Sequence, residues 1–332
     1  MNGNGFGTFI EKLRKNPQTI VMTEGTDERV LEASSRLLAS NFLKPILLGN
    51  PDEIQKKSEE AGFNIRGAQI VDPMTYDKID EMVDLFCEIR KDKGLTPEEA
   101  RELLSHPNYF GTMMIKMGLA DCMLGSSSIS TSDTVRPALQ IIKTKPGRSN
   151  VSACVILVRP SATGENEVLA MADCGINERP TVDQLVEICE DTANCAKNFG
   201  ISPKIAFLSY STKGSGHGED VDRMRNAANK AREEYPELMI EGDELQFDAA
   251  VSPRVARQKC PNSKVAGYAN TFIFLDLNAA NMGYKIAQRM GNFEAYGLIL
   301  LGLNARINNF SWGSNAMEVY SMAILTAALD LS

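Results

Sequence analysis

The sequence is poor in the residues that build metal centres and disulfide frameworks. It contains two histidines, which are too few for a histidine-based metal centre. Its seven cysteines are odd in number, scattered along the chain, and form no C-x-x-C pair, so neither a disulfide framework nor a zinc site is indicated. We therefore expect reduced thiols, no bound metal and a cytoplasmic protein.

Long apolar runs and a basic charge balance are also missing. No apolar segment approaches the length of a membrane span, and the N-terminal MNGNGFGTFIEKLRKNP lacks the apolar core of a signal peptide. The formal net charge is −8 and the isoelectric point is near 5.1, which argues against a nucleic-acid partner. An anionic small molecule remains a suitable substrate, because a local arginine cluster can lie within an acidic protein.

Short apolar runs alternate with helical patterns along the 332 residues, which predicts an α/β fold with largely parallel strands. The spacings Thr96–Glu99 and Thr181–Gln184 are typical of capping boxes at helix starts. We expect strands at Thr19–Thr23, Pro45–Gly49, Ile70–Val71, Val151–Arg159, Leu169–Ala172, Ile205–Leu208 and Thr271–Leu275, and helices at Glu28–Ala39, Asp77–Lys93, Thr96–Leu104, Thr181–Asn198, Gly283–Met290 and Met317–Leu329.

The segment Leu124–Gly147, LGSSSISTSDTVRPALQIIKTKPG, gathers hydroxyls and an arginine on one loop before a helix. Serine and threonine hydroxyls donate hydrogen bonds to phosphate oxygens, and Arg136 can hold two of them at once. The same composition is also typical of a polar surface loop that ends in a helix cap. The glycine-rich Ser209–Gly218 also has two interpretations, a loop that binds a nucleotide or a flexible turn. It lacks the residue order of a P-loop or of a dinucleotide-binding motif.

Several ordered blocks resemble the phosphate acetyltransferases (phosphotransacetylases) of the phosphate acetyl/butyryltransferase family. The resemblance runs almost from end to end of the chain. The blocks are TEGTDERVLEA (Thr23–Ala33), SHPNYFGTMM (Ser105–Met114), GLADCMLGSSS (Gly118–Ser128), DTVRPALQIIKTKPG (Asp133–Gly147), LSYSTKGSGHGEDVDRMRNA (Leu208–Ala227), DELQFDAA (Asp243–Ala250) and GYKIAQRMG (Gly283–Gly291).

The resemblance implies two α/β domains of the isocitrate/isopropylmalate dehydrogenase-like kind, with the active site in the cleft between them. The first would comprise residues 1–149 and 304–332, and the second residues 150–303. It also implies reversible acetyl transfer between acetyl phosphate and coenzyme A by direct thiolate attack in a ternary complex. Coenzyme A would be a substrate, no cofactor would be tightly bound, and the protein would be a homodimer active in acetate metabolism.

The resemblance also assigns candidate site residues. Ser311 would stabilise the developing oxyanion, Glu318 would be the thiol base, and Arg136 would hold the phosphoryl group. The further phosphate-binding candidates are Ser128, Ser130, Thr131, Arg90, Arg306 and Trp312. Coenzyme A would contact Lys213, and also Asn281, Tyr284 and Lys285, which we place at the start of a helix that follows a strand. Arg29 is a weaker candidate, because an exposed helix arginine explains it equally well.

The block Asn308–Gly313 departs from the family pattern N-D-L-S-R-G. An arginine is replaced by Trp312, the single tryptophan of the chain, and the family aspartate at the base position is replaced by Glu318. Loss of a charge-assisted arginine contact costs roughly two to three decades in rate. Arg306, where the family usually has proline, could restore the missing positive charge.

Three functions therefore remain open at this point. The first is phosphate acetyltransferase activity. The second is transfer of a longer acyl group by a phosphate butyryl- or propionyltransferase, since the altered stretch Leu298–Trp312 is rich in apolar side chains. The third is a catalytically weakened paralogue that binds coenzyme A as a sensor.

Overall fold

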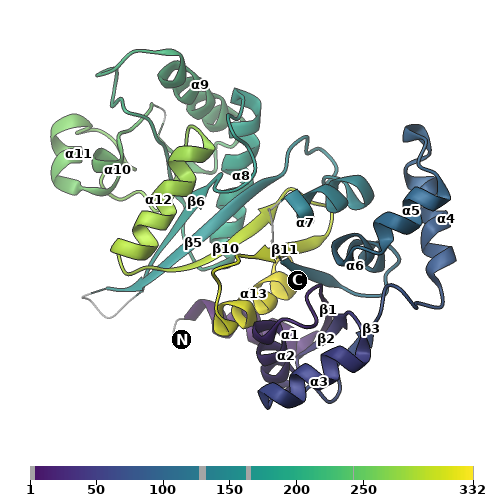
Figure 1. Ribbon diagram of the computed structural model, residues 1–332. Helices are drawn as coiled ribbons and strands as arrows, with labels where there is room; N and C mark the ends of the chain where they lie inside the picture. The colour runs from purple at the N-terminus through teal and green to yellow at the C-terminus, as the bar shows by residue number, and fades with distance from the viewer. Residues whose placement is uncertain (1–3, 127–131, 162–165, 242, 332) are drawn as a thin grey trace. The chain divides into compact units, whose positions relative to one another are not determined.

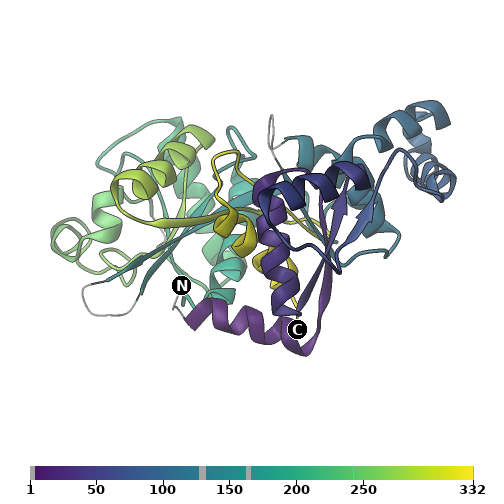
Figure 2. The same cartoon turned by 60° about the horizontal axis from the view of Figure 1, so that its bottom comes forward.

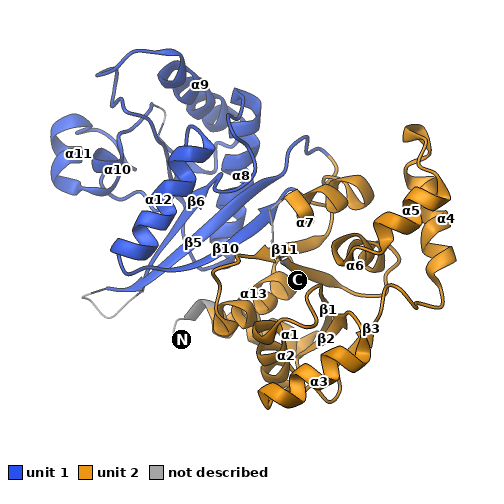
Figure 3. Cartoon of the chain, viewed as in Figure 1, with its two compact units in different colours: residues 1–5, 147–302 blue, residues 6–146, 303–332 orange. Residues whose placement is uncertain are grey.

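Two groups of strands form two separate sheets in the computed structural model, which describes residues 4–126, 132–161, 166–241 and 243–331. The chain divides into unit 1, residues 1–5 and 147–302, and unit 2, residues 6–146 and 303–332 (Figure 3). The domain boundaries predicted from the sequence were at residues 149/150 and 303/304. The α/β class with largely parallel sheets is confirmed (Figure 1).

Unit 2 is built on a parallel sheet in the order β11-β4-β1-β2-β3. The strands are β1 (Gln18–Met22), β2 (Leu43–Leu48), β3 (Gln69–Val71), β4 (Cys122–Ser126) and β11 (Arg306–Phe310). The α-helices are α1 (Asn4–Lys15), α2 (Glu28–Ser40), α3 (Pro51–Ala61), α4 (Ile79–Ile89), α5 (Pro97–Leu104), α6 (Pro107–Lys116), α7 (Ser132–Pro137) and α13 (Ala316–Ala328). The part of α1 from Phe6 onward belongs to this unit. A 3₁₀ turn at Lys91–Lys93 and a π-helix at Ala138–Ile142 complete the list of described helical segments.

Helices cover both faces of the unit 2 sheet. The purple α2 and the yellow α13 lie side by side on one face (Figure 2), where the amide of Asn308 donates to Thr326 Oγ1 at 3.0 Å. On the other face α6 approaches so closely that a Cβ on Gly111 would lie 2.7 Å from Met123 Sδ. Met123 and its register partner in β1, Val21, therefore point toward α6.

Unit 1 has a mixed sheet in the order β10-β5-β6-β9-β7-β8, in which only the β10–β5 and β5–β6 pairs of the described strands are antiparallel. The strands are β5 (Ser152–Pro160), β6 (Asn166–Ala172), β7 (Lys204–Phe207), β8 (Met239–Ile240), β9 (Thr271–Ile273) and β10 (Glu294–Leu301). The helices are α8 (Val182–Asn198), α9 (Glu219–Glu234), α10 (Phe247–Val251), α11 (Pro253–Lys259) and α12 (Leu277–Met290).

Helix starts follow their local sequence signals. Both predicted capping boxes are present, with the hydroxyls of Thr96 and Thr181 each accepting from the backbone three residues on. The prediction for α12 is wrong: the helix begins at Leu277 rather than Gly283, because the Asp276 carboxylate caps it by accepting from the Ala279 N–H at 2.8 Å. Among the described residues, no helix is both long and apolar enough to cross a bilayer.

Candidate functional site

The carboxyl edge of the unit 2 sheet collects segments that lie far apart in the sequence. β4 pairs in parallel with both β1 and β11, so the residues that follow these three strands emerge at the same edge. Thr23–Asp27 follows β1, and Ser311 follows β11. The predicted phosphate ligands Ser128, Ser130 and Thr131 follow β4 and lie outside the described residues.

A turn at Phe310–Ser314 presents Ser311. The Ser314 N–H donates to the Ser311 carbonyl at 3.0 Å, and the Gly313 N–H donates to Ser311 Oγ at 3.4 Å. Because Oγ acts as the acceptor here, the hydroxyl of this exposed side chain keeps its own proton for donation. Such a hydroxyl can donate to an oxyanion. The indole of Trp312 is 69% exposed on the same turn.

Glu318 lies in the first turn of α13 and belongs to a capping box with Asn315. The Glu318 N–H donates to Asn315 Oδ1 at 2.9 Å, and the Asn315 N–H donates back to Glu318 Oε2 at 3.0 Å. Within the described residues, Oε1 of Glu318 makes no hydrogen bond. One oxygen therefore fixes the carboxylate at a helix start, and the other is able to accept a proton.

Arg136 and Arg90 both act on the phenol of Tyr109. Burial raises the pKa of Tyr109, and the positive charges of Arg136 and Arg90 oppose that rise. The Tyr109 hydroxyl donates to Gln140 Oε1 at 3.0 Å. Arg136 is exposed in the last turn of α7, and Arg90 is partly buried just after α4. Both predicted phosphate-binding arginines thus lie close enough to Tyr109 to influence its pKa, and the sequence reasoning did not single out this tyrosine.

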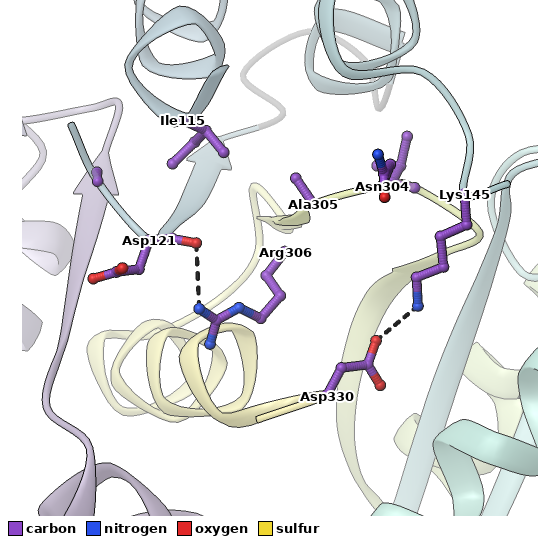
Figure 4. Close-up of a pocket in the computed structure, with 9 residues that line it drawn as sticks. Ile115, Asp121, Lys145, Asn304, Ala305, Arg306 and Asp330 are labelled. Carbon is purple, nitrogen blue, oxygen red and sulfur yellow. Dashed lines mark hydrogen bonds and ion pairs between the residues drawn. The ribbon is translucent and has the colours of Figure 1, made fainter. Parts of the chain in front are cut away.

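Arg306 is not part of this group. It begins β11 and so lies at the amino end of the strand, whereas Ser311 follows the carboxyl end, roughly 16 Å further along an extended chain. Its guanidinium donates to Gln18 Oε1 at 2.6 Å and to the carbonyls of Asp121 and Ala327. It lines a pocket of about 520 Å³, where Lys145 and Asp330 also pair at 2.8 Å (Figure 4).

Glu24 and Arg29 are further charged groups near the carboxyl end of β1. Burial raises the pKa of the Glu24 carboxyl, the Asp27 carboxylate adds to this rise, and Arg29 opposes it. Arg29 donates to the carbonyls of Trp312 and Ser314 at 2.6 and 3.0 Å. Glu24 was not singled out from the sequence; its place between the end of a buried strand and a helix cap is the signal that could have found it.

The coenzyme A candidates on α12 in unit 1 differ in their surroundings. The Asn281 amide donates to the Cys174 carbonyl at 3.1 Å. Burial, with a smaller contribution from Cys174, raises the pKa of Tyr284 to about 12, because its ring packs against the core. Lys285 is exposed, with its ammonium 5.8 Å from the Tyr284 ring centre. Since α12 begins at Leu277, these residues lie in its second and third turns rather than at its start.

The loop that carries Lys213 is held by carboxylates. Lys213 Nζ contacts Glu241 at 3.0 Å and Asp243 at 2.9 Å. Buried Glu244 accepts hydrogen bonds from Ser211 Oγ, the Gly214 N–H and Arg225. Burial raises the pKa of Glu244, but these hydrogen bonds outweigh it and lower the pKa overall. The acidic residues of this region thus pair with donors of the chain.

Comparisons with known proteins agree on one family. The sequence pattern described as phosphate acetyl/butaryl transferase matches residues 7–327. A phosphate acetyltransferase of Bacillus subtilis is 48% identical over 98% of this chain and 99% of its own length. A crystal structure of a phosphotransacetylase from Streptococcus pyogenes superposes with a TM-score of 0.90 at 49% identity, covering 98% of this chain and 97% of that one.

A phosphotransacetylase from Staphylococcus aureus superposes with a TM-score of 0.84 at 40% identity, covering 97% of this chain and 98% of that one. These matches confirm the resemblance drawn from the sequence blocks. The chain belongs to the phosphate acetyl/butaryl transferase family.

Proposed function

We propose that this chain is a phosphate acetyltransferase, which transfers an acetyl group reversibly between acetyl phosphate and coenzyme A. The observation that carries the proposal is the pair of groups that follow β11 at the carboxyl edge of the unit 2 sheet: the exposed hydroxyl of Ser311 and the Glu318 carboxylate, whose Oε1 makes no hydrogen bond within the described residues. Two arginines of the same unit, Arg90 and Arg136, lie near Tyr109 and add positive charge. The names of the relatives at 40–49% identity support acetyl as the acyl group.

Each group has a task in a ternary complex of acetyl phosphate and coenzyme A. Arg136 and Arg90 bind the phosphate oxygens and stabilise the charge that develops as phosphate departs. The Ser311 hydroxyl donates to the carbonyl oxygen as it becomes an oxyanion. Glu318 Oε1 accepts the proton of the coenzyme A thiol, whose ordinary pKa of about 8.5 leaves little thiolate at neutral pH.

The thiolate sulfur then attacks the acetyl carbonyl carbon. The C–S bond forms, the bond between that carbon and the bridging phosphate oxygen breaks, and inorganic phosphate leaves with the electron pair. Thioester and phosphate are the products, and the reverse reaction uses the same groups. No acyl-enzyme is required, since Cys122 and Cys154 are buried and burial raises the pKa of Cys122 to about 12.

For coenzyme A we propose Lys285 as the cation that meets its phosphates, because its ammonium is exposed and pairs with no carboxylate among the residues that the structure describes. Lys213 already lies between two carboxylates, and Asn281 and Tyr284 are engaged with Cys174 and the core. A homodimer and a cytoplasmic location belong to the same proposal. The active site in the cleft between the domains stays a prediction.

The test is thioester formation by the purified full chain from coenzyme A and acetyl phosphate, with propionyl and butyryl phosphate in parallel. We expect acetyl phosphate to give the highest kcat/KM and Ser311→Ala to lower it by about 10²-fold or more. Faster turnover with butyryl phosphate would replace acetyl by a longer acyl group. Coenzyme A binding without turnover of any acyl phosphate would favour the sensor function instead.

A further inference from the structure

A carboxylate–arginine pair links the start of α2 to the turn that carries Ser311. Asp27 is the N-cap of α2 and accepts from the Arg29 N–H at 2.8 Å. The same carboxylate accepts from Arg29 Nε at 3.0 Å and from Nη2 at 2.6 Å. The side chains of Arg29 and Asp27 are only 26% and 24% exposed. The guanidinium is therefore fixed by the helix cap itself.

The remaining guanidinium nitrogen faces the turn. Nη1 donates to the Trp312 carbonyl at 2.6 Å and to the Ser314 carbonyl at 3.0 Å, and the guanidinium carbon lies 5.2 Å from the Phe310 ring centre. Asp27 and the two carbonyls thus occupy all three nitrogens. An arginine used in this way has little left to offer a phosphate group, so its contacts indicate a positioning role rather than substrate binding.

Among the described residues, little else fixes the turn. Ser311, Trp312 and Gly313 are exposed, and in that part of the chain the other hydrogen bonds of residues 311–314 are internal to the turn. Within the described residues, Arg29 makes the only hydrogen bonds that tie residues 311–314 to another element. An exposed turn whose backbone carbonyls are held at two points by one side chain depends on that side chain for its geometry.

We propose that Arg29, locked by Asp27, is a positioning residue that holds the Phe310–Ser314 turn so that the Ser311 hydroxyl meets the acyl carbonyl oxygen. This inference rests on the proposed function, because the position of Ser311 affects turnover only if Ser311 takes part. A hydroxyl displaced by about 1 Å loses much of its effect on the transition state while substrate binding elsewhere is retained. Arg29 therefore acts on kcat through Ser311.

Trp312 gives a direct measurement of this turn. It is the single tryptophan of the chain, and its own carbonyl is the acceptor for Arg29. The experiment compares Arg29→Gln and Arg29→Lys with Arg36→Gln as matched control. Arg36 lies on the same helix, is 48% exposed, and pairs with Glu32 instead of the turn. For each full-length variant we would measure tryptophan anisotropy, circular dichroism, and kcat and KM for acetyl phosphate.

We expect Arg29→Gln to lower the Trp312 anisotropy and to lower kcat by about 10- to 100-fold, with KM for acetyl phosphate changed less than about twofold. Arg29→Lys should have an anisotropy and a kcat between those of Arg29→Gln and the wild type, since an ammonium group retains the charge but lacks the planar fork of the guanidinium. The Arg36→Gln variant should match the wild type in every readout.

Unchanged anisotropy in both Arg29 variants would overturn the proposal. If kcat or KM nevertheless changed, Arg29 would act on substrate directly, and the proposed function would stand. If the wild type formed no thioester, the proposed function would fail, and the anisotropy would still decide whether Arg29 fixes the turn. Should Arg29→Gln lose its helical circular dichroism, the milder Arg29→Lys variant carries the comparison.

Discussion

At the scale of single residues, Arg29 contacts the turn that carries Trp312, whereas Arg306 lies elsewhere. The indole is exposed on the turn after β11, and the cation bonded to that turn is Arg29. Arg306 begins the same strand at its other end and donates to carbonyls and to Gln18. The hydrogen bonds of its guanidinium therefore link β11 to the end of α13 and to the start of β1, which is a structural role.

This separation predicts that Trp312 and Arg306 do not compensate each other. Trp312→Arg should raise kcat/KM for acetyl phosphate by about 10²-fold or more, through a restored charge-assisted contact. Arg306→Ala should leave kcat unchanged and lower the free energy of unfolding by about 1–2 kcal/mol. A double-mutant cycle on kcat/KM should show additivity within about 0.5 kcal/mol. A larger coupling energy would show that Arg306 reaches the reaction after all.

Glu24 predicts a pH dependence of stability. Burial raises the pKa of its carboxyl above the ordinary value of 4.5, so the folded state holds this proton to a higher pH than the unfolded chain does. The contribution to stability is full below pH 4.5 and is lost as the pH rises through the raised pKa. As the pH rises from 4.5 through the raised pKa, the free energy of unfolding should therefore fall less in Glu24→Gln than in the wild type.

Urea denaturation at a series of pH values measures this difference. Glu60→Gln is the matched control, because that carboxyl is 65% exposed on α3 and its nearest cation, Lys56, is 3.9 Å away. Its pH profile should run parallel to that of the wild type. Parallel profiles for Glu24→Gln as well would mean that the Glu24 carboxyl is as well solvated in the folded protein as in the unfolded chain.

At the scale of secondary-structure elements, the proposed mechanism gives one side chain in the first turn of α13, Glu318, both a folding role and a chemical role. The capping box needs a hydrogen-bond acceptor at position 318, whereas thiol deprotonation needs a carboxylate there. Glutamine satisfies the first requirement and fails the second. The structure therefore offers a substitution that separates the two roles.

Glu318→Gln should lower kcat by about 10²-fold or more, because the thiol loses its proton acceptor. Its free energy of unfolding should stay within about 0.5 kcal/mol of the wild type, since the amide oxygen can still accept from Asn315. Glu318→Ala serves as the control that loses both roles, with a further stability loss of about 1 kcal/mol. Full activity in Glu318→Gln would remove this residue from the mechanism.

At the scale of the whole molecule, the chain enters and leaves unit 1 at neighbouring points of unit 2. Thr144 and Leu303 form an antiparallel bridge, and the Asn304 N–H donates to the Lys143 carbonyl at 3.0 Å. Each unit has its own sheet and its own buried residues. Such an insertion can be removed without stretching the remaining chain.

We expect residues 147–302 to fold when produced alone, and unit 2 to fold when Pro146 is joined to Leu303 by a short Gly-Ser linker. Circular dichroism should show a cooperative thermal transition for each piece, with the full chain as reference. Trp312 lies in unit 2 and reports that piece separately. A piece without a cooperative transition would show that its core depends on the other unit.

The sequence alone predicted much of this protein, because the signals concerned are local. Hydrophobic periodicity and N-cap chemistry located most of the described strands, fewer than half of the described α-helices, and two capping boxes. The predicted start of α12 was wrong because the capping strength of Asp276 was overlooked. The ordered sequence blocks identified the family, which the comparisons confirm.

Only the tertiary structure decided which charged side chains meet. Arg29 and the Ser311 turn are separated by more than 280 residues, and they touch because parallel strands deliver both to one sheet edge. Arg306 is close to Ser311 in sequence yet lies at the other end of β11, because an extended strand moves about 3.3 Å per residue. Sequence fixes the elements through local energetics, whereas strand order and direction determine which of their ends become neighbours.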